Sequence, residues 1–316
     1  MNIKTRHYKV ADHCFSVTAE EGDLELMTNY KVFQTTLPDD IPPVPEGEIF
    51  ALTIEQGEAI DYTEEIKQEE EGQNIICGRR TTDASEDGEA SDERQPVFEF
   101  QWDWQTAGWL VCSPDYRKAR LIVTGYARKM AIDNALMVLY ALTTAVKGTV
   151  LFHAAVVSHE GPRQDGHCPD ERRGYMFLGK SGTGKSTHAS LWGKYIEGTE
   201  LVNDDNPVVR VTDDGQAVVY GSPWSGKTPC YRNVSYPVGG IVMLSQAPYN
   251  KITPLKSVEA YIALMTSISG MRWDEKIAEG LHQTENALAS HIPIWHLECL
   301  PDEAAARLCQ TTIEKR

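Results

Sequence analysis

The feature that most constrains this chain is the sequence GKSGTGKS at residues 179–186, which matches the phosphate-binding pattern G-x-x-x-x-G-K-S/T in full. Residues 174–179 before it are short and apolar, as in a buried strand. Residues 186–196 after it carry apolar side chains at helical spacing. The pattern is meaningful only in this order of strand, loop and helix. The sequence therefore predicts a loop that wraps a phosphate group.

The residue types in the loop indicate how the anion is held. Glycines allow backbone N–H groups to turn inward, and the start of the following helix adds a favourable dipole. Lys185 reaches the outer phosphates, and the Ser186 hydroxyl is suited to Mg²⁺. The expected ligand is a nucleoside triphosphate, ATP or GTP. The expected nucleotide-binding residues are Gly179, Lys180, Ser181, Gly182, Thr183, Gly184, Lys185, Ser186 and Thr187.

Charge and cysteine usage limit the classes of partner. The 316-residue chain has a formal net charge of −16, which disfavours a non-specific grip on nucleic acid or on an anionic membrane. No stretch approaches the roughly 18 consecutive apolar residues of a spanning helix. The first twenty residues lack the apolar run of a signal peptide. The seven cysteines form no C-x-x-C pair, which is typical of reduced thiols in a cytoplasmic protein. We expect no nucleic-acid or membrane partner and leave a homo-oligomer open.

The first part of the chain, residues 1–125, is predicted to be a β-rich domain that supports or recognises a substrate. Residues 81–95 are acidic, small and polar, which indicates a solvated loop. Alternating apolar and polar residues predict the strands, which we expect at residues 8–17, 48–55, 74–80, 97–102, 108–113 and 119–125.

At residue 126 the sequence changes from alternating, strand-like segments to a long helical pattern. Residues 126–316 are therefore predicted to form a second, nucleotide-binding catalytic domain. A long apolar-faced helix is expected at 126–148, ending at Gly148. A strand is expected at 149–157, just before the strand that leads into the phosphate loop. The fold class expected here is an α/β (α+β) P-loop kinase domain.

Two adjacent carboxylates, Asp204 and Asp205, begin 19 residues after Lys185 and follow a short apolar strand. Mg²⁺ favours carboxylate and phosphate oxygens, and phosphoryl transfer needs a group that orients or deprotonates the acceptor hydroxyl. Two Asp at one strand end divide these tasks, with Asp204 or Asp205 on the metal and the other on the acceptor. The alternative is a solvent-facing turn, because Asp-Asp-Asn-Pro is good turn chemistry.

Three further elements are candidates for the same site. His153 interrupts the apolar strand at 149–157, so it is either a satisfied core residue or a group aimed at the metal or the γ-phosphate. The stretch GSPWSGK at residues 221–227 ends in Lys227, and Arg232 follows. These two cations either contact the transferred group or an anionic acceptor, or belong to a solvated structural loop. His188 is expected at the surface or beside the ribose, with no catalytic role.

The order of His153, the glycine-rich loop and the Asp pair resembles the catalytic core of HPr serine kinase/phosphorylase, which is related to the nucleotide domain of phosphoenolpyruvate carboxykinase. The resemblance spans roughly residues 148–246. It implies that Lys185 binds the β- and γ-phosphates, that Ser186 and one Asp hold Mg²⁺, and that the other Asp is the general base. The resemblance also implies a P-loop kinase domain of that type with a separate β-rich N-terminal domain.

The expected function is a Mg²⁺-dependent kinase that transfers the ATP γ-phosphoryl group to a hydroxyl of a protein, peptide or small molecule. Two alternatives remain open. One is a nucleotide-gated interaction module without phosphotransfer, in which residues 81–95 and the β-rich domain form the interaction surface. The other is the reverse direction, removal of phosphate from a phosphoserine. Carboxykinase activity is not expected, because no oxaloacetate-binding apparatus is evident.

Overall fold

The structure is a computed structural model that describes residues 2–36, 47–70, 73–81, 94–160, 172–226 and 228–314. The chain divides into two compact units, Met1–Thr143 and Thr144–Arg316. The recognition role expected for residues 1–125 and the catalytic role expected for 126–316 stay predictions.

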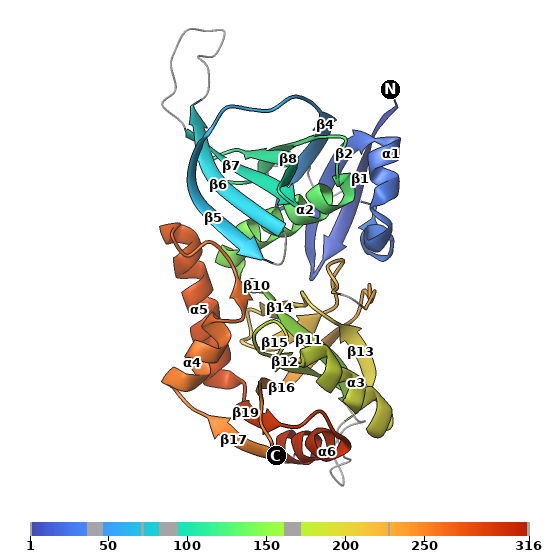
Figure 1. Cartoon of the computed structure of the whole chain (residues 1–316), viewed down its shortest axis with the longest axis vertical. Coiled ribbons are helices and arrows are strands. Elements are labelled where there is room, and N and C mark those ends of the chain that lie inside the picture. Colours follow the sequence, from blue (N-terminus) through green and yellow to red (C-terminus); the bar gives the residue numbers. More distant parts are fainter. Residues whose placement is uncertain are drawn as a thin grey trace. The chain divides into compact units, whose positions relative to one another are not determined.

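A nine-stranded sheet forms the first unit, with strand order β3-β1-β2-β4-β9-β8-β7-β6-β5 (Figure 1). Residues 8–17, expected as one strand, are instead parts of two strands, because Ala11 and Asp12 adopt positive φ angles of 45° and 65° and reverse the chain. The strands are β1 (Ile3–Val10), β2 (His13–Glu20), β3 (Gln34–Thr35), β4 (Ala51–Gln56), β5 (Thr63–Glu70), β6 (Gln73–Thr81), β7 (Arg94–Trp102), β8 (Gln105–Cys112) and β9 (Lys118–Val123). The helical segments are α1 (Glu21–Leu26), η1 (Thr28–Phe33) and α2 (Arg128–Thr144).

The long helix expected at 126–148 is confirmed as α2 followed by a short 3-10 turn, η2 (Ala145–Lys147). Its apolar face is buried in the first unit, where the Tyr140 hydroxyl donates to the Val10 carbonyl at 3.0 Å. Segment Arg128–Lys147 is long and apolar enough to cross a membrane, but 56% of its most apolar stretch is buried. Core helices share this composition, so the segment is accounted for by its packing.

The second unit is built on a ten-stranded sheet in which two strands, β12 and β19, run parallel to the long strand β16, while the other pairings among the described strands are antiparallel. The main strand order is β13-β11-β12-β16-β15-β14-β10-β18, and β19 pairs with β16 and with β17. The strands are β10 (Thr149–Phe152), β11 (Ala154–Glu160), β12 (Arg172–Leu178), β13 (Glu200–Asn203), β14 (Val208–Val211), β15 (Ala217–Tyr220), β16 (Ser235–Gln246), β17 (Lys251–Leu255), β18 (Ile268–Ser269) and β19 (Ile294–Cys299).

The expectation of an α/β P-loop kinase domain, of the HPr kinase and phosphoenolpyruvate carboxykinase type, is therefore wrong. Parallel α/β sheets are built from strands joined by helical crossovers. Here β-structure dominates both units as two large mixed sheets. The strand that leads into the phosphate loop, β12, has a parallel neighbour on one side, β16, and an antiparallel neighbour on the other, β11. The phosphate-loop pattern specifies a local strand, loop and helix, and that local structure is compatible with a mixed sheet.

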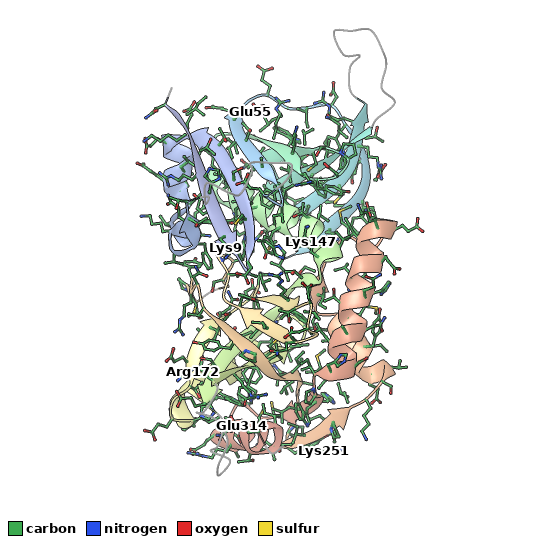
Figure 2. The ribbon with its side chains drawn as sticks, turned by 180° about the vertical axis from the view of Figure 1, so that it is seen from behind. Lys9, Glu55, Lys147, Arg172, Lys251 and Glu314 are labelled. Carbon is green, nitrogen blue, oxygen red and sulfur yellow. The ribbon has the colours of Figure 1, made fainter. Side chains whose placement is uncertain are left out.

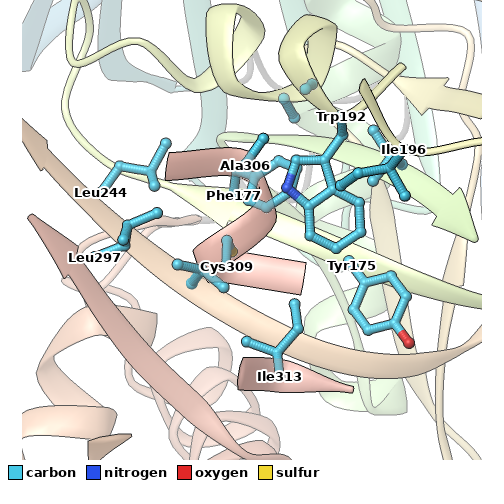
Figure 3. Close-up of a cluster of buried hydrophobic side chains, with 13 residues drawn as sticks. Tyr175, Phe177, Trp192, Ile196, Leu244, Leu297, Ala306, Cys309 and Ile313 are labelled. Atoms are coloured by element: carbon cyan, nitrogen blue, oxygen red, sulfur yellow. The ribbon is translucent and has the colours of Figure 1, made fainter. Parts of the chain in front are cut away.

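The helices of the second unit pack on its sheet, and the main apolar cluster surrounds Trp192, which is fully buried (Figures 1 and 3). The Trp192 indole lies against Tyr175 and Phe177 of β12, with ring centroids 5.4 and 5.5 Å away. This packing fixes the helix that follows the loop onto the strand that precedes it. Charged side chains such as Lys251 lie on the outside of the unit (Figure 2). The helices are α3 (Lys185–Tyr195), α4 (Val258–Met265), α5 (Glu275–His291) and α6 (Glu303–Ile313).

Candidate phosphate-binding site

The predicted strand, loop and helix are all present, as β12, residues 179–184 and α3. Gly182 and Gly184 adopt φ angles of 77° and 109°, a region that side chains with a Cβ rarely occupy. Gly184 is the N-cap of α3, so the N–H groups of the first turn of α3 face the loop. The Thr183 hydroxyl and amide both donate to the Lys180 carbonyl, at 2.7 and 3.1 Å, which closes the loop into a tight turn.

Lys185 is the first residue of α3, and its side chain folds back over the loop. It is 7% exposed, and its Nζ donates to the Gly179 carbonyl at 3.0 Å. The same Nζ lies 3.0 Å from His153 Nε2. An ammonium group carries three N–H donors and no acceptor. Lys185 thus places a positive charge between the loop and His153.

Strand direction explains how His153 reaches the loop. The expected strand at 149–157 breaks at this residue into β10 and β11, and the His153 amide donates to the Ser267 carbonyl at 2.7 Å. In the antiparallel register, Ala154 of β11 pairs with Leu178, the last residue of β12. His153 is therefore placed directly beside the start of the loop, and its side chain is 35% exposed, so it is not a core residue sealed within a strand; its role at the metal or the γ-phosphate stays a prediction.

Asp204 and Asp205 follow β13, which pairs with β11 and ends at the same edge of the sheet. The Ala154 amide donates to the Asp205 carbonyl at 2.8 Å, so backbone contacts join the Asp pair to the His153 segment. Asp205 Oδ1 lies 3.5 Å from His153 Nε2, and its side chain is about one-third exposed (34%). Asp204 is buried, and its Oδ2 accepts from the Thr228 amide at 3.2 Å. The two carboxylates thus face different partners.

His153 Nε2 cannot accept a hydrogen bond from Lys185 and donate one to Asp205 at the same time. When Nε2 accepts a hydrogen bond from the Lys185 ammonium, the ring proton is on Nδ1 and Nε2 has nothing to donate to Asp205. When Nε2 carries a proton, it donates to Asp205 Oδ1 and no longer accepts from Lys185. A group that draws the Lys185 ammonium away, such as a phosphate, therefore frees Nε2 to pair with Asp205.

Residues 221–226 hold the strand end before the Asp pair in place through hydrogen bonds to Asn203. Asn203 at the end of β13 is fully buried; its Nδ2 donates to Ser222 Oγ and to the Trp224 carbonyl, both at 3.0 Å, and its Oδ1 accepts from the Asp205 amide at 2.9 Å. A Cβ added at Gly226 would lie 3.2 Å from Asp205 Cβ, so a larger residue there would require Asp205 to shift by a few tenths of an ångström. Over the residues that the structure describes, the stretch GSPWSGK therefore stabilises the position of Asp204 and Asp205.

The two cations predicted after this segment are placed differently. Lys227 lies outside the described residues, and its contact with a phosphate or acceptor stays a prediction. Arg232 Nη1 donates to the Leu201 carbonyl at 2.7 Å, and its Nη2 pairs with Glu200 at 2.6 Å. These partners are at the start of β13, whereas Asp205 follows its end, so the structure does not bring Arg232 to the loop with Lys185 and His153.

His188 is not at the surface, which was one of its two expected positions, whereas a position beside the ribose stays a prediction. It is 3% exposed, its Nε2 accepts from Trp192 Nε1 at 3.2 Å, and its ring meets Phe177 edge-on at 4.7 Å. Burial lowers the pKa of His188 to about 4, so the imidazole is neutral. Its position at the fourth residue of α3, on the face that turns toward β12, is what buries it.

Ser186, Asp204 and Asp205 offer Mg²⁺ only part of the oxygen ligands that it needs. Mg²⁺ keeps several waters and is usually bound by one or two carboxylates together with substrate phosphates. Ser186 is exposed on the first turn of α3, and Asp204 and Asp205 lie at the neighbouring strand end. Within the described ranges, no three His, Cys, Asp or Glu side chains gather into a cluster that could hold a metal ion without phosphate. A metal bound here would depend on the triphosphate for part of its ligands.

A cavity of about 690 Å³ lies beside residues 182–184 of the loop. No sequence pattern predicted it. Its lining comes from three separated segments, so no short motif marks it. The lining residues are Gly182, Thr183, Gly184, Thr187, His188, Leu191, Leu244, Gln246, Ala247, Pro248, Cys299, Leu300 and Pro301.

Comparison with known protein families and with characterised proteins found no match for this chain. The resemblance to the HPr serine kinase/phosphorylase core thus rests on the motif residues alone and stays a prediction. The nucleotide-binding and catalytic roles of these residues stay predictions as well.

Proposed function

We propose that the protein is a Mg²⁺-dependent phosphotransferase that moves the γ-phosphoryl group of ATP to a hydroxyl acceptor. The observation that supports this best is the convergence of three separately predicted residues. Lys185 Nζ lies 3.0 Å from His153 Nε2, which lies 3.5 Å from Asp205 Oδ1. They come from the start of α3, the break before β11 and the end of β13. A structural role for each residue alone does not require that they meet beside a phosphate loop.

The geometry suggests a division of roles. The loop amides and Lys185 hold the β- and γ-phosphates, since phosphoryl transfer is catalysed chiefly by positioning and charge stabilisation. Asp205, with the more exposed carboxylate of the pair, orients the acceptor hydroxyl and takes its proton. Ser186 and the remaining oxygen of Asp204 would hold Mg²⁺, which neutralises charge that develops on the phosphate oxygens. His153 positions Asp205 once Lys185 has turned to the phosphate.

The proposed transfer balances as one displacement. The acceptor oxygen forms a bond to the γ-phosphorus while the bond from that phosphorus to the β-γ bridging oxygen breaks, and ADP leaves with the electron pair. The acceptor proton passes to Asp205. The motif order His153, loop and Asp pair, which resembles HPr serine kinase/phosphorylase, supports the same reaction class. It does not select the acceptor or the net direction of transfer.

Nucleotide binding by calorimetry, with and without Mg²⁺, tests the binding half of the proposal. We expect Lys185→Ala to weaken ATP binding by about 10–100-fold, because hydrogen bonds to a charged group are worth about 1.5–3 kcal/mol. Lys194→Ala is the matched control, since Lys194 is on the same helix and its removal changes the net charge equally. Equal affinities of Lys185→Ala and wild type would overturn the phosphate-site assignment.

ADP release tests the catalytic half, measured alone and with a panel of serine peptides and small hydroxyl compounds. We expect Asp205→Asn to bind ATP within about threefold of wild type, because Asn keeps the shape of the side chain, and to release no ADP. Wild-type rates in Asp205→Asn would exclude its role as base. ATP binding without acceptor-dependent ADP release in wild type would instead favour the nucleotide-gated interaction module.

A further inference from the structure

The cavity beside the phosphate loop lies on one side of β12. Lys185, His153 and Asp205 meet on the other side. Strands β12, β16 and β19 are mutually parallel through β16, so their carboxyl ends share one edge of the sheet. The cavity is lined by the ends of β16 and β19 and by the first turns of α3. His153 and Asp205 approach the loop from β11 and β13, the neighbours of β12 in the other direction.

This arrangement gives a bound triphosphate a direction. Lys185 Nζ points to the β11 side of the loop, where it meets His153. The outer phosphate is drawn to the same side by the positive charge of the Lys185 ammonium. The inner phosphate must then leave the loop toward the cavity, over Gly182, Thr183 and Gly184, which line the opening. The organic part of the nucleotide follows.

The lining has the character of a purine pocket. Among the described residues around it, none carries a carboxylate, ammonium or guanidinium group, and His188 is neutral. Leu191, Leu244 and Leu300 supply apolar surface, and a cavity of about 690 Å³ is within the usual 300–1,000 Å³ of ligand pockets. Gln246 Nε2 donates to the Gly182 carbonyl at 3.1 Å, which ties the loop to the pocket wall.

We propose that this cavity holds the adenosine of ATP and selects adenine over guanine; the inference rests on the proposed function. Guanine presents N1–H and N2–H donors that need acceptors, and leaving a donor buried without a partner costs about 1–3 kcal/mol. The described lining residues offer no carboxylate, which is the acceptor that pairs with both guanine donors at once; their side-chain acceptors are the single oxygens of Gln246, Thr183 and Thr187. Adenine presents a single donor group, its N6 amino group, which one such oxygen can accept. We therefore expect ATP to bind at least about tenfold more tightly than GTP.

The pocket is tested by filling it with a large side chain. Ala247 lines the cavity, and Ala247→Trp should weaken ATP binding by about tenfold or more while leaving binding of inorganic tripolyphosphate unchanged. Val258→Trp is the control, because Val258 is 68% exposed on α4 and does not line the cavity. Unchanged tripolyphosphate binding also shows that the loop of the variant remains folded. Equal losses for ATP and tripolyphosphate, or no loss for either, would overturn the pocket assignment.

Cys299 supplies a second readout inside the cavity. It is partly buried at the end of β19, and burial raises the pKa of its thiol, so alkylation is slow. ATP should slow the alkylation of Cys299, followed by peptide mass spectrometry, whereas tripolyphosphate should not. Wild-type protein that binds tripolyphosphate but shows no ATP protection would refute the pocket and leave the phosphate site standing. Wild-type protein that binds neither ligand would refute the proposed function itself.

Discussion

The burial of His188 beneath the phosphate loop predicts a pH-dependent loss of stability in the second unit. The folded state keeps this imidazole neutral, because its surroundings are apolar rings and its Nε2 accepts from Trp192 Nε1. Burial lowers the pKa of His188 to about 4 from the ordinary value of 6.5. Because the folded pKa is lowered, a pH between these two values protonates His188 in the unfolded chain but not in the folded one. The free energy of unfolding therefore falls as the pH falls through 6.5.

The magnitude follows from the size of the shift. One pKa unit corresponds to about 1.36 kcal/mol, so a fall from 6.5 to about 4 is worth about 3 kcal/mol once the pH lies below 4. Over the narrower range from pH 7.5 to 5.5, the same linkage predicts that His188 alone costs about 1 kcal/mol. This is a sizeable part of the total stability of a domain.

The assay is urea-induced unfolding at pH 7.5 and 5.5, on wild type and on His188→Gln. Glutamine does not titrate in this range and retains an oxygen that accepts from Trp192 Nε1. Other titrating groups affect both proteins equally, so the difference between their pH dependences isolates His188. We expect wild type to lose about 1 kcal/mol more than His188→Gln across this range. Parallel losses in the two proteins would show that His188 is solvated or protonated in the folded state and would refute the reasoning.

Three further substitutions test the helix that carries Lys185. Gly184→Ala should destabilise the second unit by about 1–3 kcal/mol in denaturant unfolding, because φ is 109° at this position, whereas Gly193→Ala on the exposed face of α3 should stabilise it by about 0.5–1 kcal/mol; the same sign for both would contradict the strain argument. Trp192→Ala should cost about 3–5 kcal/mol in the same measurement, since the fully buried indole leaves a cavity between β12 and α6, and a cost below about 1 kcal/mol would show that the core does not depend on it.

Local structure was predictable where the sequence pattern is local. The phosphate-loop strand and helix and the long helix α2 are confirmed, because a glycine-rich loop between apolar segments and a sustained helical period each specify their own neighbourhood. The sheet topology was not predictable. Strand pairing depends on contacts between distant segments, and the antiparallel insertion of β11 beside β12 leaves no mark on either segment alone.

The same distinction separates the parts of the site. Lys185 and the Asp pair were identified by spacing from a motif, and the structure brings Lys185, His153 and Asp205 together. Arg232 was grouped with them because it is near in sequence, yet Glu200 holds it at the start of β13. The cavity of about 690 Å³ was not predictable, because its walls come from three segments, at α3, β16 and β19, that carry no motif of their own.

Strand direction, rather than the loop itself, accounts for the assembly of this site. Because β11 is antiparallel to both β12 and β13, its first residue lies at the edge where those two strands end. A β11 of the opposite direction would carry His153 to the far edge of the sheet, about 20 Å away for a seven-residue strand. The mixed sheet is therefore the feature that joins the histidine and the carboxylate to the phosphate loop.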